Sequence, residues 1–119
     1  MDTHKIDYIL GYFGHFMTKD EALAFRHYSS TYKLKHSQNK DKTRNQTRKK
    51  MFYERGWLSK EPNILSLLAN GIDKFREKTA MRILKKHEKE IYFNNCPECG
   101  SLARTPKAKQ CRFCKHDWH

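Results

Sequence analysis

Residues 96–114 read Cys-Pro-Glu-Cys-Gly-Ser-Leu-Ala-Arg-Thr-Pro-Lys-Ala-Lys-Gln-Cys-Arg-Phe-Cys. This stretch holds all four cysteines of the 119-residue chain, in two Cys-x-x-Cys pairs that eleven residues separate. A Cys-x-x-Cys turn sets two thiolates apart by about one edge of a metal–sulfur tetrahedron, and a second turn facing it completes the tetrahedron. The spacing therefore predicts one zinc ion, Zn2+, held by Cys96, Cys99, Cys111 and Cys114.

The predicted zinc ion is structural, because four thiolates fill a coordination shell in which catalytic zinc keeps one position open. Two alternatives stay open from the sequence: iron takes the same four sulfurs, and His116 or His119 could replace one thiolate. A redox-active Cys-x-x-Cys pair would instead precede a helix in a strand–helix–strand unit, which the sequence does not contain.

The residues Cys-Pro-Glu-Cys-Gly at 96–100 and Cys-Arg-Phe-Cys at 111–114 resemble the zinc-ribbon, or rubredoxin-like, family, over less than a fifth of the chain. The resemblance implies zinc and a small antiparallel sheet, and it says little about activity. We expect strands at 101–104 and 109–111, a turn at Pro106 and Lys107, and a third strand at 91–94. In layout the whole chain resembles small bacterial zinc-ribbon proteins of uncharacterised activity.

Two details of the tail refine this expectation. Only five residues follow Cys114, too few for the helix that a treble-clef arrangement would need. The family's usual glycine after the fourth cysteine is Lys115 here. Because that position often needs a positive φ, which lysine tolerates poorly, we expect a slightly distorted second turn.

The rest of the sequence predicts a mainly α fold, with a helical body over 1–90 followed by the small β zinc ribbon over 91–119. Apolar residues at helical spacing, together with glycine stops, predict helices at 6–17, 18–34, 48–55, 63–70 and 72–90. Thr18 and Glu21 fit a capping box, and Trp57 and Leu58 are expected to fold back after Gly56. Residues 36–47, which are polar and basic, are expected to form a mobile loop.

Composition narrows the class of protein. Aromatic residues make up 13% of the chain, too many for a disordered tail, and charged residues make up 32%. No apolar run approaches the roughly 18 residues that a membrane span needs, and the first residues do not read as a signal peptide. We therefore expect a cytoplasmic protein, whose thiols stay reduced and available to a metal.

The net charge of +12 is unevenly distributed, since residues 33–50 carry eight basic side chains and only Asp41 as an acid. Such patches attract polyanions, most often nucleic acid, although a merely solvated surface is the alternative. RNA or single strands are favoured, because no helix has the composition of a base-reading DNA-binding motif. The candidate contacts are Lys40, Lys42, Arg44, Arg48, Lys49, Lys50, Arg104, Lys107, Lys109, Arg112, Lys115, Phe113 and Trp118.

Aromatic residues flank the predicted metal site and allow two interpretations. Tyr92, Phe93, Phe113 and Trp118 could stack on bases beside the basic side chains, or they could dock the tail onto the helical body. The second functional hypothesis is a protein-interaction adapter that binds an acidic partner through the tail and the basic loop. The sequence gives no indication of oligomeric state.

No enzymatic activity is expected. His27 could act as a base for Ser30 or Thr31, but these residues are simply neighbours on a helix, and no nearby aspartate is placed to orient the imidazole. The sequence contains neither a His-Glu-x-x-His zinc motif nor a phosphate-binding Gly-x-x-x-x-Gly-Lys loop. Its acidic residues are also too scattered for a two-metal nuclease centre.

Overall fold

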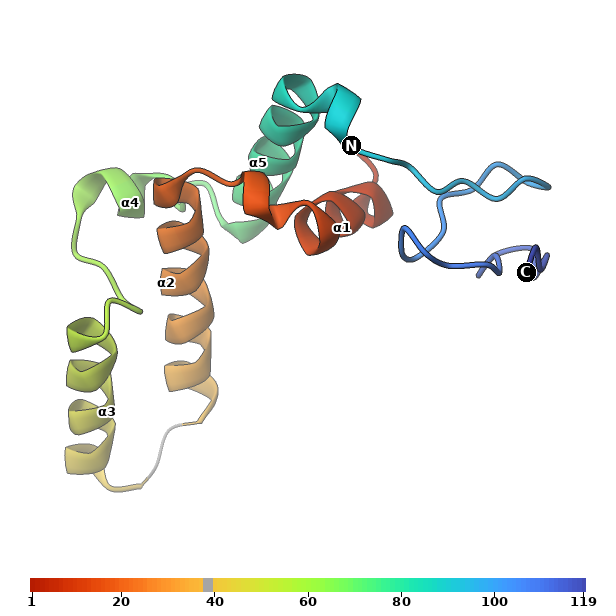
Figure 1. Cartoon of the computed structure of the whole chain (residues 1–119). Helices are drawn as coiled ribbons and strands as arrows, with labels where there is room; N and C mark the ends of the chain where they lie inside the picture. The colour runs from red at the N-terminus through yellow and green to blue at the C-terminus, as the bar shows by residue number, and fades with distance from the viewer. Residues whose placement is uncertain (38–39) are drawn as a thin grey trace. The chain divides into compact units, whose positions relative to one another are not determined.

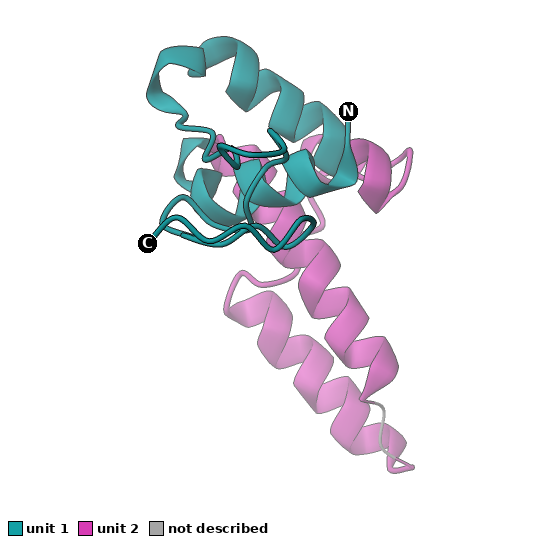
Figure 2. Ribbon diagram, turned by 90° about the vertical axis from the view of Figure 1, so that its right-hand side faces the viewer, with its two compact units in different colours: residues 1–16, 76–119 teal, residues 17–75 magenta. Residues whose placement is uncertain are grey.

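The computed structural model describes residues 1–37 and 40–119, and within them the regular elements are helices (Figure 1). The chain forms two compact units, residues 17–75 and residues 1–16 with 76–119 (Figure 2). The mainly α prediction is confirmed, while the predicted boundary near residue 90 stays a prediction. The elements in order are α1 (Thr3–Tyr12), η1 (Gly14–Phe16), α2 (Lys19–His36), α3 (Lys42–Glu54), α4 (Pro62–Ser66), α5 (Ile72–Lys86) and η2 (Glu88–Glu90).

Helix α2 begins at the predicted capping box. The Thr18 hydroxyl accepts a hydrogen bond from the Glu21 amide at 3.2 Å, and the Glu21 carboxylate accepts one from the Thr18 amide at 2.8 Å. Two amides that have no partner within the helix are thereby satisfied. The helix runs two residues past its expected end, to His36, and its basic last turn suits the negative end of the helix dipole.

Helix α3 replaces the second half of the expected loop at 36–47, and α2 includes His36, so that prediction is wrong for residues 36 and 42–47. The Asp41 carboxylate accepts hydrogen bonds from the amides of Thr43 at 2.9 Å and Arg44 at 3.4 Å, and thus caps the helix. Polar and basic side chains do not prevent a helix once its start is capped and they can extend into water. Gln38 and Asn39, also in the expected loop, lie outside the described residues.

The unit formed by residues 17–75 has a small apolar core that joins α2, α4 and the start of α5. Ala24, Ile64 and Phe75 are buried there. After α3 the chain reverses as predicted: the amides of Trp57 and Leu58 donate to the Phe52 carbonyl at 2.9 and 3.3 Å. Four partly buried apolar side chains complete this core: Leu23, Phe25, Leu68 and Ile72.

A histidine on α2 ties down the segment that follows this reversal. The Ser59 amide donates to Nδ1 of His27 at 2.9 Å. Burial lowers the pKa of His27, so the ring stays neutral and its Nδ1 lone pair stays available as an acceptor.

In the other unit, α1 and η1 are tied to the later part of α5. Arg76 forms a 2.6 Å ion pair with Asp7, and an Arg82 nitrogen donates to the Phe16 carbonyl at 2.9 Å. The Phe16 ring stacks on His87 with 3.9 Å between centroids. The predicted apolar stripe of α5 is buried as expected, with Thr79 at 2% and Ile83 at 0% exposure in this unit.

The predicted β ribbon is wrong. The described part of the chain contains no strand or sheet, and the expected strands at 91–94, 101–104 and 109–111 are absent. Two isolated antiparallel bridges take their place, Asn95 with Leu102 and Gln110 with Asp117. Each bridge closes the base of one cysteine turn, so the backbone hydrogen bonds of the tail are made within each turn rather than between long strands.

We expect replacement of His27 to lower the free energy of unfolding. His27→Ala removes the acceptor of the Ser59 amide and should cost about 1 kcal/mol, whereas His27→Asn keeps an acceptor near the position of Nδ1 and should cost less. Urea denaturation followed by circular dichroism measures both. An equal loss in the two variants would contradict the role of the hydrogen bond.

The same pair predicts a pH dependence. Because the folded-state pKa of His27 lies below its ordinary value of 6.5, its contribution to stability is complete above about pH 6.5. It is lost as the pH falls through the folded-state pKa, since the unfolded chain then binds the proton more strongly. The difference in unfolding midpoint between the natural chain and His27→Asn should therefore change between pH 7 and pH 5, and a constant difference would contradict this assignment.

Candidate metal centre

The four cysteine sulfurs gather in one place. All four Sγ atoms lie within 4.8 Å of one another, with Cys96 and Cys114 3.7 Å apart and Cys99 and Cys111 3.5 Å apart. Four thiolates about 2.3 Å from a zinc ion would be separated by roughly 3.8 Å. The four cysteines, which belong to two turns separated in the sequence, can therefore hold one metal ion such as zinc, as the sequence predicted.

The two cysteine turns repeat the same backbone pattern. The Cys96 amide donates to the Ser101 carbonyl and the Cys111 amide to the His116 carbonyl, both at 2.8 Å. At equivalent positions, the Gly100 amide donates to the Cys96 carbonyl at 2.9 Å and the Lys115 amide to the Cys111 carbonyl at 3.1 Å. Each turn buries its first cysteine and leaves the second exposed.

The position after each pair has a positive φ, as expected. Gly100 has φ 76° and Lys115 has φ 67°, the one non-glycine residue with positive φ in the described part of the chain. The second turn therefore keeps the conformation of the first despite its lysine. We expected the lysine to distort the turn. Instead, Lys115 adopts the strained left-handed conformation and the turn keeps its shape.

Hydrogen bonds favour the ionised form of two of the thiols. Bonds from Ser101 lower the pKa of Cys99 to about 6, and the amides of Cys114 and Phe113, at 3.4 and 3.3 Å from the sulfur, lower the pKa of Cys111. Such N–H···S bonds spread the charge of a metal-bound thiolate.

Cys114 differs from these two thiols. The His116 amide lowers its pKa, but desolvation of the sulfur and the three neighbouring thiols outweigh that bond and raise the pKa to about 12. A bound dication would remove this last proton, because a metal-coordinating thiol is deprotonated.

The cysteine-bearing tail packs on α1 through a residue that sequence reasoning missed, Tyr8. Its hydroxyl donates to the Tyr92 carbonyl and accepts from the Asn94 amide at 3.3 Å, and its ring stacks on Phe93 at 5.8 Å. The ammonium of Lys5 lies 4.9 Å from the centre of the same Phe93 ring. Phe93 therefore serves docking, whereas Tyr92 keeps 62% of its surface exposed.

The turn between the cysteine pairs is held by a buried amide. The Asn94 side chain donates to the carbonyls of Thr105 and Ala108, both at 2.9 Å. Between them lies the predicted turn at Pro106 and Lys107, which the structure confirms. Tyr8 does not share the helix face of Ile6 and Ile9, and no sequence signal pairs it with Asn94.

The predicted nucleic-acid contacts of the tail are only partly brought together. Arg104, Arg112 and Lys115 line one hollow of about 260 Å³ beside Cys111. The aromatic candidates lie elsewhere in this unit: Phe113 is 52% exposed with its ring 5.6 Å from His4, and Trp118 stacks on His116 at 6.0 Å. Lys107 and Lys109 are exposed and do not line this hollow.

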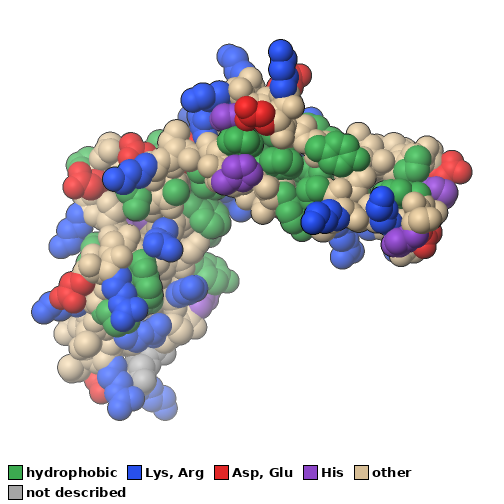
Figure 3. All heavy atoms as spheres, in the orientation of Figure 1, with side chains coloured by type: hydrophobic (Ala, Val, Ile, Leu, Met, Phe, Trp, Pro, Cys, Tyr) green, Lys and Arg blue, Asp and Glu red, His purple; other side chains and the backbone are tan. Residues whose placement is uncertain are grey.

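The remaining candidates lie in the other unit, on or before α3, where Lys and Arg side chains gather on the visible face (Figure 3). Arg48 is engaged, since its guanidinium donates to the Ser37 carbonyl and hydroxyl at 3.0 Å each. Arg44 lies 3.8 Å from the Asp41 carboxylate. The candidates with exposed side chains are Lys40, Lys42, Arg44, Lys49 and Lys50.

Two residues missing from the candidate list lie beside these lysines. A cleft of about 410 Å³ is lined by Lys49 and Lys50 together with Tyr53, Lys60, Gln46 and Glu54. The Lys60 ammonium lies 5.0 Å from the centre of the Tyr53 ring. Tyr53 follows Lys49 and Lys50 at helical spacing, which would have identified it had a helix been expected from residue 42.

Comparison with protein-family models, curated proteins and solved structures returned no match. Among the described helices, none combines the length and the apolar character needed to cross a membrane.

The repeated turns predict opposite effects of two substitutions. Lys115→Gly should relieve about 1 kcal/mol of backbone strain and raise zinc affinity roughly five-fold. Gly100→Ala should lower it by a similar factor, because a side chain there meets no atom within 4 Å and only the positive φ opposes it. Competition with a chromophoric chelator measures both affinities. Equal affinities for the two variants would show that φ at this position does not limit the site.

Proposed function

We propose that this chain is a zinc-binding, non-enzymatic protein that binds nucleic acid, with RNA or single strands favoured. The observation that carries the nucleic-acid proposal is the exposed, cationic face of α3. Lys42, Lys49 and Lys50 are exposed and form no ion pair within the described residues. These lysines recur with Gln46 and Tyr53 at the spacing of one helix face.

The charge of this helix is concentrated enough to attract a polyanion. Helix α3 carries five basic side chains, and its single acidic residue, Glu54, is the last. Lysines on a helix face can neutralise successive phosphates and release their condensed counterions, which drives binding without sequence readout.

The cleft beside α3 favours single strands over duplexes. Tyr53 offers a flat ring next to Lys49, Lys50 and Lys60, and unpaired bases stack on such rings while lysines contact the backbone. A base inside a duplex is stacked between its neighbours and has no free face for the ring. This mixture supports RNA or single-stranded DNA as the ligand class.

The tail makes few other stabilising interactions, and this supports a structural role for the metal. Residues 91–119 contain two isolated bridges and bury a few apolar side chains, among them Ile91 and Ala103. Zinc binding to four thiolates supplies apparent free energy on the order of 10 kcal/mol, which such a segment needs in order to fold. Four sulfurs leave no open coordination position, which supports a non-catalytic site.

We expect the purified chain to hold one zinc ion, measured as metal content per protein. Cys96→Ser or Cys111→Ser should abolish stoichiometric binding, because both buried sulfurs belong to the cluster. Chelation should unfold the tail and shift the NMR signals of Tyr8. If the purified chain contains iron, iron replaces zinc in the proposal. Full metal content in both variants would refute the four-sulfur site.

We expect nucleic-acid binding to weaken steeply with salt. About five phosphate contacts give a slope of log affinity against log salt between roughly −3.5 and −4.5, measured by fluorescence anisotropy with a labelled single strand. Replacing Lys42, Lys49 and Lys50 together by Gln should reduce that slope by about 2.

The matched control replaces three exposed lysines of α5, Lys78, Lys85 and Lys86, by Gln, with the same change in net charge. An equal loss in both triple variants would mean that net charge, rather than the α3 face, governs binding. A pull-down with and without nuclease separates the two functional hypotheses: protein partners that survive nuclease treatment, in a chain that binds no nucleic acid, would favour the adapter.

A further inference from the structure

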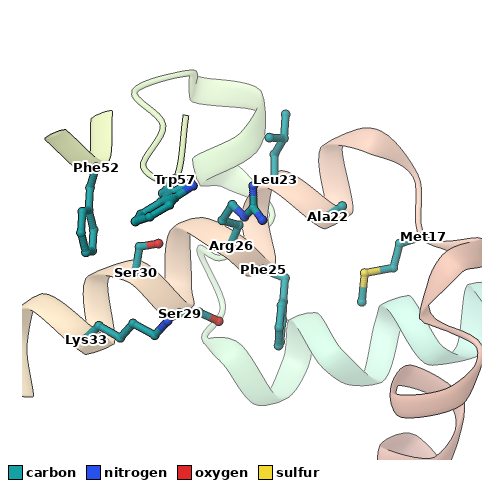
Figure 4. Close-up of a pocket in the computed structure, with 10 residues that line it drawn as sticks. All are labelled: Met17, Ala22, Leu23, Phe25, Arg26, Ser29, Ser30, Lys33, Phe52 and Trp57. Carbon is teal, nitrogen blue, oxygen red and sulfur yellow. The ribbon is translucent and has the colours of Figure 1, made fainter. Parts of the chain in front are cut away.

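A hollow of about 660 Å³ lies in the unit formed by residues 17–75, apart from the lysine face of α3. Figure 4 shows its lining side chains, which come from α2, from Met17 just before it, from the end of α3 and from the reversal after α3. The lining combines large apolar groups, two cations and two hydroxyls, and it includes no acidic side chain. The volume is within the range of sites that hold small organic ligands.

The aromatic part of the hollow is already well packed at its base. Phe52 is 6% exposed and meets Trp57 edge to face, with 5.0 Å between ring centroids. Phe25 is only partly buried against the apolar core of this unit. The site therefore presents aromatic surface that is held in place but still accessible.

Cations stand beside this aromatic surface. Arg26 and Lys33 line the hollow from α2, both have exposed side chains, and neither forms an ion pair within the described residues. Ser29 lies between them on the same helix. Flat apolar surface next to unpaired cations is complementary to a ligand that has a flat ring at one end and an anion at the other.

We propose that this hollow receives one unpaired nucleotide of a bound single strand, with the base against the partly exposed rings of Phe25 and Trp57 and its phosphate near Arg26 and Lys33. The proposal rests on the nucleic-acid function proposed above and deepens it. Helix α3 borders both surfaces, because Phe52 lines the hollow while Lys49 and Lys50 line the cleft described above. A strand of several nucleotides can cross a helix, whose width is about 10 Å.

The first test asks whether bases add affinity. Oligothymidylate of about 12 nucleotides is compared with a strand of equal length made of abasic sites, using the full chain loaded with zinc. We expect the natural strand to bind about ten-fold more tightly, since each stacked base contributes in the range of 5- to 150-fold. Equal affinities would overturn the proposal.

Filling the hollow provides the matched comparison. Ser29→Met places a longer side chain in the hollow and should bring the ratio of the two affinities toward one. Thr31→Met adds the same side chain at an exposed position of α2 outside the lining and should leave the ratio unchanged. Thermal unfolding of both variants checks the fold. If Ser29→Met does not fold, Arg26→Gln replaces it, with Lys35→Gln as its control and a smaller salt slope as the readout.

An NMR measurement locates the effect. The indole N–H signals of Trp57 and Trp118 are assigned with a Trp118→Phe variant in the absence of ligand, and oligothymidylate should shift the Trp57 signal. Strand binding that depends on the α3 lysines but leaves Trp57 unmoved would overturn this inference and keep the proposed function. No strand binding at low salt would refute both. A Trp57 shift that follows protein concentration alone would assign the hollow to a second copy of the chain.

Discussion

A shortage of apolar side chains governs how this chain folds. Hydrophobic residues make up 37% of the sequence, against a net charge of +12 whose repulsion opposes compaction. Hydrophobic burial alone therefore supplies little beyond the conformational entropy that folding costs. Each unit supplements a small core with directed polar contacts: the His27 acceptor in residues 17–75, and the Arg76–Asp7 pair and Tyr8 hydroxyl in the other unit.

The tail shows this constraint in its sharpest form. The tail has no sheet, and its backbone hydrogen bonds close two similar cysteine turns. The four sulfurs of the two turns lie close together, and as thiolates they would repel one another unless a cation lay among them. The proposed metal would thus replace the core that the sequence cannot provide, while Phe93 and Asn94 connect the site to α1 and to the intervening turn.

Features set by a few neighbouring residues could be predicted from the sequence, and features set by distant ones could not. The capping box at Thr18, the cysteine cluster and the positive φ at Lys115 each follow from local stereochemistry. The helical start of α3 does not follow from an apolar pattern, because residues 42–47 are polar, and one cap, Asp41, is enough to begin the helix there. The sheet was expected from family resemblance, and Tyr8 and the 660 Å³ hollow depend on packing between distant segments.

The arrangement of charge separates the proposed metal site from the proposed ligand surface. A closed four-sulfur site carries a formal charge of −2 with zinc, so the basic side chains beside it, such as Arg112 and Lys115, are partly balanced by the site itself. Lys49 and Lys50 on α3 have a single acidic side chain, Glu54, beside them in their cleft, so the proposed attraction for phosphate would be weakened mainly by salt. Under the proposed function, a base would have to leave any duplex to enter the hollow beside Trp57, because a base within a duplex is stacked between its neighbours. Charge would then govern affinity, and the aromatic hollow would govern the choice of single strands.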